Sequence, residues 1–355
     1  MSKYLFFLIL IFLVVLRFLT TKNNFKDGDK VRITSSVYSE PSVRGNSQSF
    51  SLRGLKIVLS RFPEVHYGDK VVIEGKVKEG VLERAKLTKL SVSPNVLVNI
   101  RRSLINFYTK ALPEPHGSLI AGITIGAKQS LPYDFIKILQ KTGTSHVIVA
   151  SGMNVTFASE FVFNLLISFV SRKKALLITI LSIWIYSIIT SFEAPIVRAS
   201  VMLSFVFVGQ YFGRITDTFR ILIITFLVML FINPLWIKDI GFILSFATTL
   251  SLVIFESKVK SLISFVPEIF KESLSTSLAA QIGSTPIIFY FFHQFNIFSP
   301  LTNALVLWTI PIIMVISSIA GLVGLIVEPV GNFILILCYP MTSWFVGVVN
   351  LFSKI

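Results

Sequence analysis

From Val147 to its end, the chain is a succession of long apolar stretches separated by short polar segments. A helix needs about 20 apolar residues to cross a bilayer core of about 30 Å, and most of these stretches approach that length. The run around Pro311 is compatible with one kinked helix or with two shorter pieces. Eight predicted spans lie near residues 147–170, 175–191, 196–212, 219–233, 240–256, 274–292, 300–327 and 331–351.

Composition supports a polytopic α-helical membrane protein. Of 355 residues, 53% are hydrophobic and only 14% are charged, a balance outside that of ordinary soluble domains. No group of residues has metal-ligand spacing, and no glycine-rich phosphate loop is present. We therefore expect no cofactor and no metal.

The amino-terminal part divides into two predicted domains. Residues 1–22 hold an apolar run of about 13 residues, too short for a typical span, without a small-x-small cleavage site, which favours a retained anchor helix over a signal peptide. Residues 23–95 contain short stretches such as DKVRITSSV and YGDKVVIEGKV, bounded by turn residues. We predict a small external β-barrel resembling an OB-fold. Such barrels often bind single strands or oligosaccharides, and a spacer that binds nothing is an equal alternative.

Residues 96–146 are predicted to form an amphipathic and re-entrant helical segment. The first helix has an apolar stripe, with cations beside it. It suits either a membrane interface, with its cations toward the headgroups, or packing against the barrel. The stretch 118–127 is too short to span and rich in glycine, which predicts a re-entrant or half-buried piece. The stripe consists of Leu97, Ile100, Leu104, Phe107 and Tyr108, and Arg101, Arg102 and Lys110 lie off it.

Charge distribution predicts the orientation. Lys and Arg concentrate in alternate loops of 147–355, which places those loops in the cytoplasm, the amino terminus inside and the barrel outside. The external residues 22–146 hold 20 Lys and Arg against 10 Asp and Glu. Such an excess attracts a polyanion, with nucleic acid the first candidate and anionic lipid or wall polymer the alternatives. The predicted DNA-binding residues are Arg101, Arg102, Lys110 and Lys128.

Four segments resemble one family in order and spacing. They are LPYDFIKILQKTGTSHVIVASGMNVTF (131–157), EAPIVRASVM, NPLWIKDIGFILSFATTL and QIGSTPIIFYFFHQFNIFSPLTNALV. They resemble the ComEC-type competence channels, which pass transforming DNA into bacteria. The resemblance implies a multi-pass protein of the bacterial cytoplasmic (inner) membrane that translocates single-stranded DNA, rather than an enzyme.

The chain also departs from that family's pattern. Asn154 stands where members commonly have a histidine, and the amino-terminal part looks shortened. The His-x-His-x-Asp-His cluster of the metallo-β-lactamase-like nuclease domain is absent from the sequence. We therefore expect a separate nuclease, a cytosolic ATP-driven translocase and a DNA receptor as partners, besides membrane lipids and a possible second copy of the chain.

Small and polar residues at the start of the first long span form the candidate site. Such residues are tolerated where they line a wet path or allow close helix packing. A third alternative is an intramembrane serine hydrolase using Ser151 and His146. Arg198 suits either a pore or snorkelling to the interface, and a helix break is expected near Gln281 and Pro286. The channel-lining candidates are His146, Ser151, Gly152, Asn154, Glu160, Arg198 and Gln281.

The leading function is therefore a DNA-translocating channel. The alternatives are an exporter or flippase of an anionic lipid-linked or wall polymer and the serine hydrolase.

Overall fold

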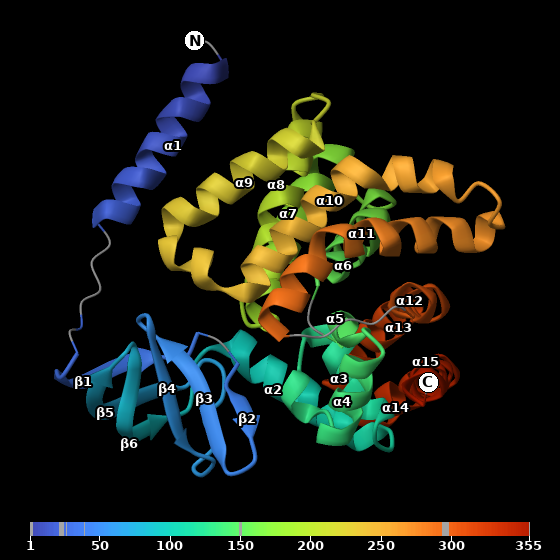
Figure 1. Cartoon of the computed structure of the whole chain (residues 1–355). Helices are drawn as coiled ribbons and strands as arrows, with labels where there is room; N and C mark the ends of the chain where they lie inside the picture. Colours follow the sequence, from blue (N-terminus) through green and yellow to red (C-terminus); the bar gives the residue numbers. More distant parts are fainter. Residues whose placement is uncertain are drawn as a thin grey trace.

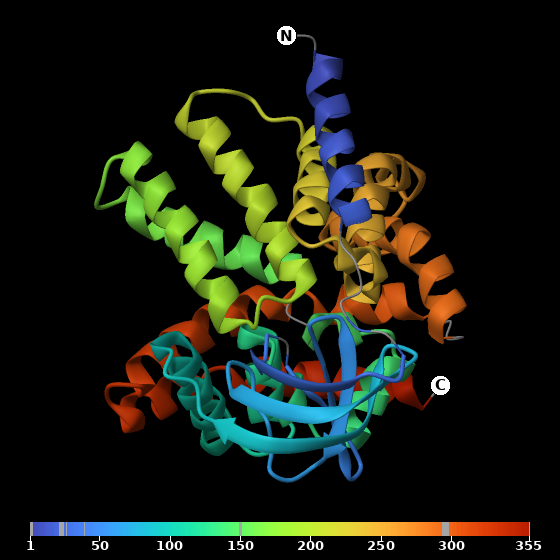
Figure 2. The same cartoon turned by 90° about the vertical axis from the view of Figure 1, so that its left-hand side faces the viewer.

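A computed structural model describes residues 3–20, 25, 27–38, 40–148, 151–292 and 298–354. One curved β-sheet lies beside a larger helical part, and the first helix of the chain packs against that helical part (Figures 1 and 2). Mostly helical structure with apolar helices and a small amino-terminal sheet agrees with the coarser part of the predicted fold class.

Among the described residues, the sheet has six strands. Hydrophobic residues alternate with polar ones along them, as in β4, where Leu55, Ile57 and Leu59 are buried and the intervening residues are exposed. The buried face forms its own hydrophobic core. The strands are β1 (Lys30–Ser36), β2 (Ser42–Arg44), β3 (Ser47–Leu52), β4 (Leu55–Ser60), β5 (Lys70–Lys78) and β6 (Val81–Ser91).

Strand pairing gives an open order, β1-β5-β6-β4-β3-β2. All neighbours are antiparallel except β4 and β6, which run parallel where Lys56 lies beside Val81. Among the described residues, the edge strands β1 and β2 do not pair with each other. Closure into an OB-like barrel is therefore not confirmed.

Helices make up the rest of the fold, with two short 3-10 turns, η1 (Lys128–Ser130) and η2 (Pro234–Lys238). They are α1 (Lys3–Thr20), α2 (Val96–Ala111), α3 (His116–Ile125), α4 (Tyr133–Lys141), α5 (Ser145–Ile148), α6 (Gly152–Ile167), α7 (Arg172–Ile189), α8 (Ala194–Tyr211), α9 (Thr218–Ile232), α10 (Ile240–Leu262), α11 (Glu268–Phe292), α12 (Ser299–Val306), α13 (Thr309–Gly324), α14 (Glu328–Ile336) and α15 (Tyr339–Ser353).

The helical part has two levels. The lower one contains α2 to α5 and α12 to α15 and shares a single hydrophobic core. The upper one contains α6 to α11, with smaller cores among α6 to α10. In Figure 1, α12 and α15 are seen nearly end-on, and in Figure 2 they run across the view beneath the upper helices.

Helix α3 is the centre of the lower level. Every residue from Gly117 to Ile125 is buried, as expected for a helix that is hydrophobic all round. The predicted short, glycine-rich piece is therefore a core helix covered by protein.

Helix α2 packs between the sheet and the helices. Its buried residues include Leu104, Phe107 and Tyr108, and the Tyr108 hydroxyl donates a hydrogen bond to the Ser317 carbonyl (2.9 Å). Arg101 is also buried, so of the two alternatives for this helix, the one with cations facing headgroups is wrong for Arg101, and packing against the sheet domain agrees with the structure. The reason is a largely buried carboxylate contributed by the sheet domain, described below.

Each of the eight predicted spans contains helix, but the last two are broken. α12 and α13 meet at a 45° bend, and α14 and α15 at a 50° bend. The run around Pro311 is thus two pieces, and the single helix expected at 331–351 is wrong. Pro340 explains the second break, because it lies at the start of α15, where a missing N–H is tolerated.

The break expected near Gln281 is absent from the described residues. α11 continues through Pro286 to Phe292. By length and composition, α8 and α10 are each long and apolar enough to cross a membrane, and four spans result if each bent pair counts as one. α6 and α9 are shorter apolar helices.

Candidate functional site at the start of helix α6

A tight turn connects α4 to α5. Gly143 has φ of 71°, and a Cβ there would overlap the hydroxyl of Ser299 at the start of α12. Glycine therefore satisfies both the left-handed backbone and the close approach. Beside it, the hydroxyls of Thr142 and Thr144 are 2.9 Å apart and fully buried. This turn therefore sets where α5 begins beside α12.

Ser151 and Asn154 bind each other and the lower level. The Ser151 hydroxyl donates to Oδ1 of Asn154 (3.1 Å), and the Asn154 amide donates to the Ile123 carbonyl (2.8 Å). Asn154 is fully buried. This pair therefore joins α6 to the carboxyl end of α3.

Gly152 lies against Arg198 of α8. A Cβ at Gly152 would overlap Nη2 of Arg198 and lie 3.3 Å from the Cβ of Ala199. The glycine therefore leaves room for a guanidinium at the first residue of α6. The structure thus brings together four of the predicted residues, Ser151, Gly152, Asn154 and Arg198, where α6, α8 and α10 meet.

Arg198 is only 9% exposed, so it does not snorkel to the surface. Its Nη1 donates to the Ser245 carbonyl of α10 (3.2 Å). Its Nε has no hydrogen-bond partner in the part of the chain that the structure describes. Nor does any carboxylate within that part form an ion pair with it.

The remaining predicted residues lie outside this cluster. Glu160 is exposed on α6, about two turns further along the helix. Gln281 is half-buried on α11, and that helix packs on α10, where the Ser251 hydroxyl donates to the Ala279 carbonyl (2.6 Å). His146 is exposed, and its Nδ1 is 3.1 Å from the Gly143 carbonyl. None of the described contacts joins His146 to Ser151, the pair that a hydrolase would need.

Arg101 connects the sheet to the helices. Its Nη2 lies 2.8 Å from Oε2 of Glu40, its Nη1 donates to the Ile189 carbonyl (2.8 Å) and to the Ile125 carbonyl, and its side chain is 2% exposed. Burial raises the pKa of the neighbouring Tyr67 hydroxyl, and the guanidinium opposes that rise. We call the group Glu40, Arg101 and the two carbonyls the interdomain tie. It leaves Arg101 no free face for a DNA phosphate.

Two more of the predicted DNA-binding residues are also paired. Arg102 lies 2.6 Å from the buried Asp69 carboxylate. Lys128 lies 3.0 Å from Glu193, with its side chain 40% exposed. Lys110 differs from them, because it is exposed and the described residues include no acidic partner for it.

The exposed face of the sheet carries a charged groove of about 600 Å³ across β1, β5 and β6. Lys30 lies directly opposite Lys76, and Glu74 lies between Arg32 and Lys86 in the strand register. Like charges placed opposite each other destabilise a sheet. The groove residues are Lys30, Val31, Arg32, Glu74, Gly75, Lys76, Glu83 and Lys86.

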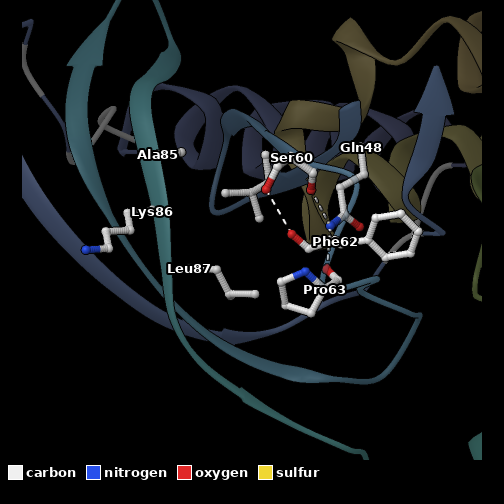
Figure 3. Close-up of a pocket in the computed structure, with 8 residues that line it drawn as sticks. Gln48, Ser60, Phe62, Pro63, Ala85, Lys86 and Leu87 are labelled. Carbon is white, nitrogen blue, oxygen red and sulfur yellow. Dashed lines mark hydrogen bonds between the residues drawn. The ribbon is translucent and has the colours of Figure 1, made fainter. Parts of the chain in front are cut away.

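A smaller pocket of about 180 Å³ lies beside it (Figure 3). The Gln48 amide donates to the carbonyls of Ser60 (2.9 Å) and Pro63 (2.7 Å), and its oxygen accepts from Val65 N–H (3.0 Å). Gln48 therefore fixes the loop and is not free to bind a ligand. Figure 3 shows Lys86 pointing away from this group, and the nearby Phe62 is 66% exposed.

Several residues of these sites were not predicted from the sequence. Ser245 and Ile123 act through backbone carbonyls, which carry no residue-type signal. Glu40 is 61 residues from Arg101 in the chain, so spacing could not pair them. Glu193 is the first residue of the EAPIVRASVM segment. The resemblance of this segment to the family could have marked Glu193 as a candidate.

Two known bacterial proteins are similar to part of this chain. Over 226 residues, 63% of the chain, it is 26% identical to ComE operon protein 3 of Bacillus subtilis (strain 168), covering 29% of that relative. Over 244 residues, 65% of the chain, it is 23% identical to the uncharacterized protein YcaI of Escherichia coli (strain K12), covering 32% of it. The match thus spans about a third of each relative's length. No solved structure matches the chain.

A family profile gives the same assignment. The competence protein family matches residues 123–355, which begin in α3 and include the whole cluster around α6. The match leaves out the sheet and α2. Because it covers well over half of the sequence, the chain belongs to the competence protein family.

Proposed function

We propose that this protein is a channel of the bacterial cytoplasmic membrane that passes single-stranded DNA into the cell during natural competence. The observation that carries the proposal is the family match over residues 123–355. All four sequence segments that resemble ComEC-type channels lie within that range, since the first begins at Leu131 and the last ends at Val306.

The channel path is proposed to pass the cluster around α6. A charged strand crosses a membrane only along a route that offers polar groups, because isolated charge in hydrocarbon is very costly. The start of α6 supplies Ser151, Asn154 and a buried guanidinium at a junction of three helices. Glu160 and Gln281 are proposed to lie further along the same route.

The sheet domain is proposed to lie outside the membrane and to receive DNA, in the manner of an OB-like fold. Four exposed cations line its groove against two acidic residues. The exposed Phe62, with the Arg61 guanidinium 5.5 Å from its ring, offers a stacking surface for bases. Phosphate attraction and base stacking are the two interactions that single-strand binders combine.

Energy and strand processing are assigned to partners. The sequence has no phosphate-binding loop, so we propose that a cytosolic ATP-driven translocase pulls the strand, that a separate nuclease removes its complement, and that a DNA receptor delivers it. Two or more copies of the chain are proposed to assemble around one path.

Uptake of labelled DNA tests the function. Competent cells with the gene, without it, and with the gene restored should differ in internalised single strands, and surface-bound DNA should be unchanged. Unchanged internalisation in the deletion strain, with altered export of an anionic wall polymer, would replace the channel by the exporter.

Orientation is tested by thiol labelling from outside the cell. A cysteine in place of the exposed Tyr38 should react with an impermeant reagent, and one in place of the exposed Lys174 should not. The native Cys338 is buried and gives the background. Labelling at Lys174 alone would invert the proposed topology.

A further inference from the structure

The guanidinium of Arg198 lies against the amino end of α6, so two positive charges are adjacent. The amino end of a helix carries roughly half a unit charge from its free N–H groups. α6 has no acidic residue in its first turn, and no side chain caps it, because the Ser151 hydroxyl is directed to Asn154. The guanidinium of Arg198 is packed directly against Gly152 at this end.

The described surroundings do not neutralise this charge. Arg198 is more than nine-tenths buried, its Nε is unpartnered, and its described hydrogen bond is the one to the Ser245 carbonyl. Burial of a cation without an anion carries a large desolvation penalty. The interdomain tie shows what this fold does when an arginine is purely structural, since there Glu40 neutralises Arg101.

We propose that Arg198 and the first turn of α6 form an anion site for a phosphate group. Its source in this protein is the phosphodiester of the transported strand, and that assignment rests on the proposed function. A guanidinium and helix N–H groups are the donors that proteins combine around phosphate. Gly152 is part of the site because any side chain there would displace Nη2 of Arg198.

The geometry suits a transient contact better than a permanent one. One guanidinium and one helix end can hold a single phosphate at a time, and the site lies at the junction of α6, α8 and α10. A strand drawn past it would exchange one phosphate for the next. The site would thus compensate the charge of each phosphate as that phosphate leaves water. The strand would not be stopped, because each contact is brief.

The test uses the full chain in nanodiscs of zwitterionic lipid. The ligands are a short single strand with phosphodiester linkages, the same sequence with neutral methylphosphonate linkages, and inorganic phosphate. The variants are Arg198→Gln, which removes the charge, and Gly152→Ala, which keeps the charge but displaces it. Arg214→Gln, at an exposed position between α8 and α9, is the matched control for net charge.

Both site variants should weaken binding of the phosphodiester strand by about tenfold, or about 1.4 kcal/mol. Arg214→Gln should change it by less than about twofold, a fraction of that free energy, and binding of the neutral strand should not respond to any variant. If Arg198→Gln does not fold, Arg198→Lys, which keeps the charge without the planar fork, should still weaken binding several-fold. Equal effects of Arg198→Gln and Arg214→Gln would overturn the site.

Two further arms separate this inference from the proposed function. If wild-type protein binds no strand but inorganic phosphate raises its melting temperature, and Arg198→Gln abolishes that rise, the anion site stands and the DNA function fails. If only nanodiscs with phosphatidylglycerol give an Arg198-dependent rise, the site holds a lipid headgroup, and its assignment to the strand is overturned.

Discussion

Two buried arginines lie in two regions of this protein and have opposite surroundings. In the interdomain tie, Arg101 meets a carboxylate at 2.8 Å and two backbone carbonyls, and it is 2% exposed. At the start of α6, Arg198 is 9% exposed but has one carbonyl at 3.2 Å and no described carboxylate. This fold therefore supplies a carboxylate and two carbonyls to the guanidinium of Arg101. To the guanidinium of Arg198, the described residues supply one carbonyl and no carboxylate.

The contrast suggests two different roles. Arg101 stabilises the fold, and Arg198 is available to bind an anionic ligand. Removing one partner of a satisfied buried pair leaves the other uncompensated and is strongly destabilising. Removing a buried charge that has no counter-ion relieves a cost instead. The sign of the stability change therefore distinguishes the two roles, and the predictions below test it.

The largest expected effect is at the tie. Arg101→Met should destabilise the protein by about 3–5 kcal/mol, because Glu40 is left without its cation in a largely buried position. Thermal unfolding in detergent measures this change. The double variant Arg101→Met with Glu40→Leu should recover most of it, and a loss in the double variant equal to the sum of both single losses would show that the two residues do not act as a pair.

The next effect is at the junction of the two helical levels. Asn154→Leu removes the hydrogen bond to the Ile123 carbonyl and should cost about 1–3 kcal/mol. DNA uptake in cells should fall with it. Thr156→Val is the control, because the described hydrogen bond of this hydroxyl goes to the Gly152 carbonyl of its own helix, and it should change stability by about 0.5 kcal/mol or less. If Asn154→Leu and Thr156→Val lost similar amounts of stability, the hydrogen bond from Asn154 would not be what joins α6 to α3.

A smaller effect of opposite sign is expected at Arg198. Arg198→Met should leave the stability of the ligand-free protein unchanged or raise it by about 1 kcal/mol, while uptake of DNA falls. Melting temperature and uptake are measured on the same variant. A loss of stability like that of Arg101→Met would mean that Arg198 is structural and that the contrast between the two arginines is false.

The smallest effect is expected at Ser151. Its hydroxyl donates one hydrogen bond to Asn154, so Ser151→Ala should cost about 1 kcal/mol or less and leave uptake nearly intact. Abolished uptake in a folded, inserted Ser151→Ala protein would instead support a nucleophilic serine. Labelling of wild-type protein with a serine-directed probe would then be the deciding measurement.

Much of the architecture follows from patterns within single segments. Apolar runs predict helices because each helix satisfies its own backbone hydrogen bonds, and alternation predicts the strands of the sheet. The breaks were harder to place. Pro311 lies in the first turn of α13, just after the bend, where no backbone bond is lost, so it marks the start of the second piece and not a kink within one helix. Pro286, by contrast, lies inside α11 without ending it.

The candidate site was predictable as a segment but not as a set of contacts. Ser151, Gly152 and Asn154 stand together in the sequence, so their polarity at the start of an apolar run was visible. That Arg198 packs on Gly152, and that Glu40 neutralises Arg101, depends on contacts between residues far apart in the chain. Charge alone therefore misassigned Arg101 to a surface.

The most direct test follows a strand stalled during transport. A labelled single strand with a bulky trailing end is halted in competent cells that carry a photo-crosslinking residue at Ser245 or at Ile189. Both positions are half-buried, and their carbonyls accept from Arg198 and Arg101 respectively. The account predicts crosslinks to the strand from position 245 and none from position 189. Crosslinks from position 189 alone, or from both positions equally, would contradict it.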